Sequence, residues 1–152
     1  MSELKASGPD AEAIARYITD TFPGVDVVSI PGGTFFSLDP EKHFPNFATI
    51  VTNDDFDDAS NLSRPGLFRV NMGVTRATFE RYVDSSIEPD YPAVDTVLPH
   101  PVYGRQLWLS IVSPSADTFE TVIRPLLAGA YERLAAQRAR HARRPEGDAR
   151  SD

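Results

Sequence analysis

The segment from Pro99 to Tyr103, PHPVY, holds the side chains of this chain best suited to acid–base chemistry. Two prolines stiffen the backbone around His100, since the residue before a proline is held in extended geometry. An imidazole fixed in this way could transfer protons near neutral pH, with the Tyr103 hydroxyl as a second donor. The alternative is a structural loop in which His100 hydrogen-bonds a backbone carbonyl. The sequence is compatible with both interpretations.

A second group of polar side chains lies in the β-rich stretch 67–74. Arg69 and Asn71 are two residues apart, so on a strand they share one face. Trp108, the only tryptophan, begins a later alternating stretch, and on a neighbouring strand it would lie about 5 Å from one of them. A cation, an amide, an imidazole and an aromatic wall are typical of a pocket for a small polar or carboxylate-bearing ligand. We therefore predict a ligand site formed by Arg69, Asn71, His100, Tyr103 and Trp108. The alternative is a solvated sheet face on which Arg69 pairs with Asp54 or Asp57.

The acidic loop 53–58 is a weaker candidate for a metal site. Four carboxylates could hold a hard cation such as Ca²⁺ or Mg²⁺ through oxygen, and they are Asp54, Asp55, Asp57 and Asp58. The EF-hand pattern fails, because counting from Asp55 the sixth position is Ser60 and no Glu follows at the twelfth. Asp side chains that cap nearby backbone N–H groups are the preferred interpretation. His43 with His100 is the remaining pair of possible ligands, and we predict neither a metal nor another cofactor.

Composition and charge narrow the class of protein. A chain of 152 residues with 41% hydrophobic residues is expected to form one domain. The absence of cysteine excludes disulfides and thiolate metal sites, and with an N-terminus too charged for a signal peptide it favours a cytoplasmic protein without membrane spans. The formal net charge is −7, and six arginines against three acids from Arg133 onward leave −10 on residues 1–132. Such a body repels phosphate, so nucleic acid is an unlikely partner.

The elements that must position these residues follow from periodicity. Helices are expected at 11–22, 75–83 and 119–134, with a kink or a new helix start at Pro125, and strands at 25–30, 34–38, 47–53, 67–74 and 107–112. Consecutive strands followed by strand–helix alternation predict an α+β domain, with helices packed on one face of an antiparallel sheet of about five strands. The domain should span 9–141, with disordered ends at 1–8 and in the Arg-rich tail 142–152. The expected core is Ile14, Ile18, Leu109, Ile111, Ile123, Leu126, Leu127 and Tyr131.

Several motifs resemble known families. The runs FATIVTND, RPGLFRVNMG and HPVYGRQLWLSIVSP, within about Ile14 to Leu134, resemble an uncharacterised domain-of-unknown-function family of small bacterial proteins. More remotely, Phe22-Pro23-Gly24-Val25, Gln106-Leu107-Trp108 and the pairs Leu126-Leu127 and Ala130-Tyr131 are similar to the MmcQ/YjbR-like group. That remote resemblance implies a CyaY-like α+β fold, and some members of the group are labelled DNA-binding.

The sequence thus favours a cofactor-free small-molecule-binding or accessory domain. One alternative is a small metal-independent enzyme that uses His100 and Tyr103 for acid–base chemistry. A second, which rests on the YjbR-like resemblance alone, is a nucleic-acid-associated protein.

Overall fold

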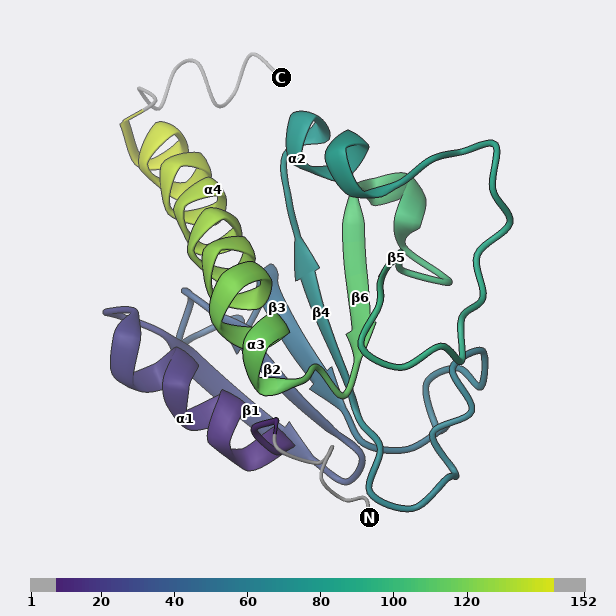
Figure 1. Ribbon diagram of the computed structural model, residues 1–152. Helices are drawn as coiled ribbons and strands as arrows, with labels where there is room; N and C mark the ends of the chain where they lie inside the picture. The colour runs from purple at the N-terminus through teal and green to yellow at the C-terminus, as the bar shows by residue number, and fades with distance from the viewer. Residues whose placement is uncertain (1–7, 144–152) are drawn as a thin grey trace.

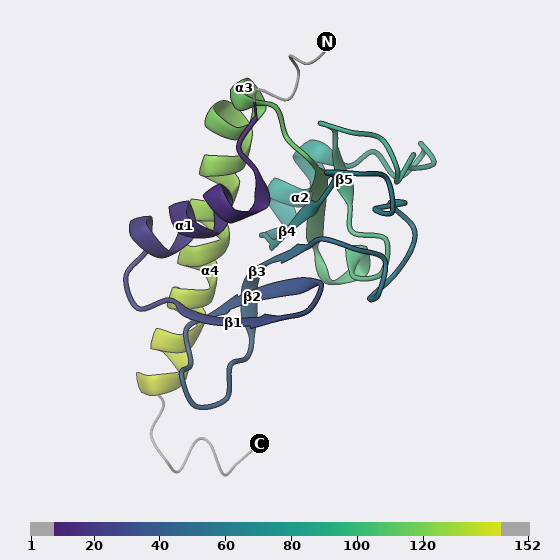
Figure 2. The same ribbon diagram turned by 90° about the horizontal axis from the view of Figure 1, so that it is seen from below.

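The fold is an α+β sandwich of one sheet and one helical layer, described for residues 8–143 in a computed structural model. The sheet is antiparallel throughout, in the order β1-β2-β3-β4-β6-β5. Its strands are β1 (Asp26–Ile30), β2 (Gly33–Ser37), β3 (Asn46–Val51), β4 (Arg69–Gly73), β5 (Val97–Pro99) and β6 (Trp108–Val112). The helices are α1 (Ala11–Thr21), α2 (Arg76–Tyr82), α3 (Ala116–Thr118), a π turn (Phe119–Ile123) and α4 (Arg124–Arg143). Helices α1 and α4 lie on the same side of the sheet in Figures 1 and 2. The predicted fold class is confirmed.

The sixth strand, β5, is the element that periodicity missed. It has three residues, includes Pro99 and pairs only with β6, at the edge of the sheet. Proline is tolerated on an edge strand because no neighbouring strand needs a hydrogen bond from its missing N–H. In a sequence, however, a proline argues against a strand, so β5 was not predicted. This short strand fixes His100, which follows it directly, beside β6.

Helix boundaries follow local capping chemistry. The Asp10 carboxylate accepts the N–H of Ala13 at the start of α1, and the Thr75 hydroxyl accepts the N–H of Thr78 at the start of α2. Pro125 is the second residue of α4, directly after the π turn, so the predicted restart at this proline is observed. Helix α4 extends to Arg143, two residues past the expected domain end. The N-terminal residues 1–7 and the tail 144–152, for which disorder was expected, lie outside the described residues.

The core lies between the helices and one face of the sheet. Seven of the eight predicted core residues are buried there, while Tyr131 is only partly buried because its hydroxyl reaches the Pro23 carbonyl, 2.6 Å away. Leu127 and Ile14 are completely buried. None of the helices within 8–143 has the length and apolar character needed to cross a membrane.

Strand register gives the sheet a second, polar face. The cross-strand partners Phe35–Thr49, Thr49–Asn71 and Asn71–Ser110 form one row across β2, β3, β4 and β6. The intervening positions, such as Ile50 and Val70, face the helical core instead. The long connections that follow β3 and α2 lie beyond the sheet from α1 and α4 in Figure 1, and their contacts with this second face are described below.

Candidate functional site

Arg69 is the buried centre of a hydrogen-bond network on the second face. Its side chain is 2% exposed and makes a bidentate ion pair with Asp57, with Nη1–Oδ1 and Nη2–Oδ2 distances of 3.0 and 2.8 Å. Nη1 also donates to the Ser60 hydroxyl at 2.9 Å. The Arg69 side-chain hydrogen bond lowers the pKa of Asp57, so the pair remains ionised and its charges cancel locally. Asp57 is therefore one of the two partners that the alternative named, but the solvated sheet face of that alternative is wrong, because the acidic loop folds over the guanidinium.

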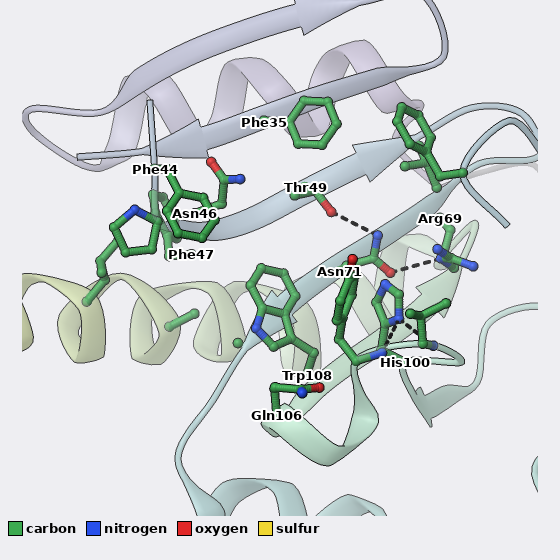
Figure 3. Close-up of a pocket in the computed structure, with 18 of the residues that line it drawn as sticks. Phe35, Phe44, Asn46, Phe47, Thr49, Arg69, Asn71, His100, Gln106 and Trp108 are labelled. Carbon is green, nitrogen blue, oxygen red and sulfur yellow. Dashed lines mark hydrogen bonds between the residues drawn. The ribbon is translucent and has the colours of Figure 1, made fainter. Parts of the chain in front are cut away.

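Asn71 joins this network to the neighbouring strands. Its Oδ1 accepts from Arg69 Nε at 2.9 Å and from the Ser110 hydroxyl at 2.7 Å. Its Nδ2 donates to Thr49 Oγ1 at 2.9 Å. Figure 3 shows the contacts with Arg69 and Thr49, which fix the amide orientation from two sides. The carbonyl oxygen of Asn71 is fully used, whereas its amide nitrogen keeps one N–H.

His100 is held by the loop that it begins. The backbone N–H groups of Val102 and Tyr103 both donate to His100 Nδ1, each at 3.0 Å. The expected bond to a backbone carbonyl was wrong, since the ring accepts from amides and Nε2 must then carry the proton of the neutral ring. Burial, together with the nearby Arg69 charge, lowers the pKa of His100 to about 4, while the Asp57 carboxylate opposes this shift. The imidazole is therefore neutral at pH 7, with Nε2–H turned away from these amides in Figure 3.

Trp108 and Tyr103 supply aromatic surface next to His100. The ring centroids of Trp108 and Tyr103 lie 6.4 and 5.0 Å from that of His100. Trp108 stands opposite Gly73 in the β4–β6 ladder. A Cβ on Gly73 would lie 2.9 Å from indole atoms Cε2 and Nε1, so the indole lies flat against the strand only because residue 73 is glycine. Tyr103 is half exposed.

A cavity of about 630 Å³ opens over this network. All five residues of the predicted ligand site line it, drawn from β4, β6 and the loop after β5. Sequence reasoning missed its other polar and aromatic lining, which comes from β2, the segment before β3, β3 itself, the acidic loop, the turn before β6 and α4. These residues are Phe35, Phe44, Asn46, Phe47, Thr49, Phe56, Gln106, Arg133 and Gln137. Thr49 could have been found from its alternation with the core residues Ala48 and Ile50, once β3 and β4 were known to be paired. The remaining members depend on how separate segments converge, for which local sequence gives no signal.

The comparisons with known proteins place the chain in one family. Residues 9–145 match the model of a family of unknown function (DUF6194). The chain belongs to this family. No curated protein and no solved structure matched. The resemblance of residues 14–134 to an uncharacterised family is thus confirmed, whereas the remoter similarity to the MmcQ/YjbR-like group gained no support.

Several of the candidate metal ligands, Asp54, Asp57, His43 and His100, have structural partners. Asp54 accepts the N–H of Leu62 at 2.8 Å, beside the small apolar cluster that Leu62 forms with Val51 and Val112. His43 Nδ1 lies 2.8 Å from Asp26 Oδ2, while His100 is bound to its own loop. Within residues 8–143, three or more His, Asp or Glu side chains nowhere gather as metal ligands.

Arg64 ties the acidic loop to its neighbour. Its guanidinium donates to the carbonyls of Asn61, Ser60 and Pro92, each at 2.9 Å. The carbonyl of Pro92 belongs to the long loop after α2, so Arg64 clamps together two of the segments that cover the second face of the sheet.

Proposed function

We propose that this protein binds a small, partly aromatic polar molecule in the cavity over β4 and β6, without a cofactor. The observation that carries the proposal is the combination of aromatic walls with a rigid floor of hydrogen-bonded polar side chains. Small-molecule sites typically measure about 300–1,000 Å³, are mostly apolar and contain a few fixed polar groups. The cavity of about 630 Å³ falls within that range.

The mouth of the cavity also supports binding. Phe44, Val102 and Tyr103 are among the large hydrophobic side chains that the protein leaves exposed, and all three line this cavity. Apolar side chains gathered at one opening gain stability when a ligand covers them, whereas scattered ones need no explanation. We infer that the apolar part of the ligand lies between Phe44 and the Val102–Tyr103 turn.

Acid–base catalysis by His100 and Tyr103 is the alternative function. A general base needs a free lone pair and a pKa near the working pH. At His100, Nδ1 is occupied by two backbone amides, and the pKa of about 4 leaves the ring a poor proton acceptor whose Nε2–H is a hydrogen-bond donor. These features favour a role for His100 in binding a ligand by hydrogen bonding over a role in removing a proton from it.

The charge of the chain favours a small ligand over a nucleic acid. Residues 1–132, which include most of the cavity lining, carry a formal charge of −10. Duplex DNA is expected to bind no tighter than the non-specific range of about 10⁻⁴–10⁻⁶ M at physiological salt. Because a cysteine-free chain suits a reducing compartment, we expect the protein to act in the cytosol.

A fragment screen by ¹H–¹⁵N NMR tests the proposal. We expect small aromatic fragments with one polar substituent to shift the amides of Asn71, Gly73 and Val102 and the indole N–H of Trp108 together. Val102→Trp at the mouth should weaken binding at least about tenfold by filling the opening. The matched control is Ile87→Trp, since Ile87 is 65% exposed, Val102 is 53% exposed, and only Val102 lines the cavity. Shifts confined to other surfaces, or equal effects of the two variants, would contradict the proposed function.

A further inference from the structure

The inference concerns which chemical groups the floor of the cavity offers to a ligand. The floor is formed by Thr49, Asn71 and His100, with the Arg69–Asp57 pair beside them. Three of these five side chains are almost completely buried: Arg69, Asn71 and His100 are exposed by 2, 1 and 6%. Buried polar groups without a partner are costly, so the groups that the protein leaves open there indicate what the ligand supplies.

The acceptors of this floor are largely taken by the protein itself. Asn71 Oδ1 receives two hydrogen bonds, from Arg69 and Ser110, and His100 Nδ1 receives two, from Val102 and Tyr103. The Asp57 carboxylate receives two from Arg69 and one from the N–H of Ala59.

The donors are not all taken. Within residues 8–143, Nε2–H of His100 has no hydrogen-bond partner. Asn71 uses one of its two amide N–H bonds, on Thr49, and the Thr49 hydroxyl, which accepts that bond, keeps its own proton. Two of these groups, His100 Nε2–H and the second Asn71 N–H, can only donate. The open N–H groups of the floor therefore favour a ligand group that accepts hydrogen bonds.

The floor also carries no net charge. The positive charge of Arg69 is matched by the bidentate Asp57 carboxylate, and the imidazole is neutral. A carboxylate seated there would be buried without a counter-ion, and an ammonium group would find most of the acceptors already occupied; both are unfavourable. The one further cation of the lining, Arg133, is an exposed residue of α4.

We propose that the ligand of this cavity, granted the proposed function, is an aromatic molecule that presents an uncharged carbonyl-type oxygen to Asn71 and His100. The aromatic part lies against Trp108 and the mouth residues, and the oxygen accepts from Asn71 Nδ2–H and His100 Nε2–H. An acid or an amine of the same shape binds more weakly. The ligand predicted from the sequence, a small polar or carboxylate-bearing molecule, is thereby narrowed to a neutral polar one.

A matched series of naphthalenes tests this proposal on the full chain. The probes are 2-acetylnaphthalene, 2-naphthoate, 2-naphthylmethylammonium and unsubstituted naphthalene, which share one ring system and differ in the polar group. Binding is followed by the fluorescence of Trp108, the only tryptophan, and by calorimetry. We expect the ketone to bind at least about tenfold tighter than each other probe at pH 7.

Two isosteric variants test whether Asn71 causes the preference for the ketone probe. Asn71→Asp replaces the donating amide nitrogen by an accepting oxygen, so the ketone should lose at least about tenfold in affinity and the ammonium probe should gain. Asn61→Asp adds the same charge at an exposed residue outside the cavity lining and is the control for a general electrostatic effect. The preference for the ketone should persist in Asn61→Asp.

The outcomes separate the two proposals. Equal binding of all probes, or tightest binding of 2-naphthoate, overturns the neutral-acceptor assignment while the binding function stands. Failure of every probe, naphthalene included, overturns both. An independent measurement needs no variant: long-range ¹H–¹⁵N NMR should show His100 protonated at Nε2 in the free protein, and a ring protonated at Nδ1 overturns the assignment.

Discussion

The two faces of the central sheet are carried by the same strands and are held together by different forces. On the helix-covered face, Ile50, Val70 and Leu109 are buried by apolar contact with α1 and α4. On the other face, Thr49, Asn71 and Ser110 occupy the alternate positions of these strands and form a chain of hydrogen bonds. Apolar contact is non-directional, so the first face tolerates small shifts.

Hydrogen bonds are directional, and this difference bears on function. The floor side chains Thr49, Asn71, Arg69, Asp57 and His100 are each oriented by at least one partner, so the cavity has a floor that is preorganised before a ligand arrives. The helix face supplies stability, and the loop-covered face supplies a defined pattern of donors and acceptors. The predictions below test this division.

The largest expected effect comes from breaking the polar face at its ion pair. Asp57→Ala should lower the free energy of unfolding by about 3–5 kcal/mol, because it leaves the buried Arg69 charge without a counter-ion. Urea unfolding measures the loss. The double variant Arg69→Met/Asp57→Leu removes both charges and should recover most of it. A double variant no more stable than Asp57→Ala would show that the pair itself, rather than the orphaned charge, supplies the stability.

The helix face should respond to loss of volume. Leu127→Ala should cost about 2–5 kcal/mol, since the side chain is completely buried and its removal leaves a cavity in the core. The comparison is Arg140→Ala on the exposed side of the same helix, which should stay within about 0.5 kcal/mol of wild type. Thermal and urea unfolding measure both. A loss under 1 kcal/mol for Leu127→Ala would mean that α4 packs loosely on the sheet.

Lowering the pH should destabilise the protein through protonation of His100 before the carboxylates are protonated. The folded protein protonates His100 with a pKa of about 4 and the unfolded chain with the ordinary histidine pKa of 6.5, so the unfolded state binds more protons between these values. Stability should therefore fall as pH drops from 6.5 to 4, by at most about 3 kcal/mol from this residue. His100→Gln should flatten the unfolding free energy in that window. The pKa of Asp57 is held below its ordinary value of 3.8 by Arg69, so the contribution of this carboxylate is lost only at lower pH. An unchanged slope in His100→Gln would assign the acid sensitivity to other groups.

The smallest effect concerns the aromatic wall. Gly73→Ala places a Cβ within 2.9 Å of the indole, so the Trp108 ring should move away and its emission should shift, at a cost of about 1–3 kcal/mol. In a Trp108→Leu background the same substitution should cost less, because the clash is gone. An equal cost in both backgrounds would place the strain in the β4 backbone instead of the ring contact.

The sequence by itself determined the elements and their apolar faces. Alternation in β4 and β6 placed Val70 and Leu109 in the core, and the 3.6-residue period of the last helix placed Ile123 and Leu127 there, because burial of apolar surface dominates folding and depends on local spacing. Arg69 and Asn71 were assigned to one strand face for the same reason. Periodicity carried no signal for β5, whose three residues are too few to alternate.

Only the tertiary structure decided what those polar residues do. The register of β3, β4 and β6 brought Thr49, Asn71 and Ser110 into one row. The folding of the acidic loop over this face placed the Asp57 carboxylate beside Arg69. The direction of the His100 hydrogen bonds, which makes the ring a donor to the cavity, depends on how the backbone turns after Pro101. Contacts between residues distant in sequence depend on chain closure and on partners that compete for each hydrogen bond, and neither is encoded in local spacing.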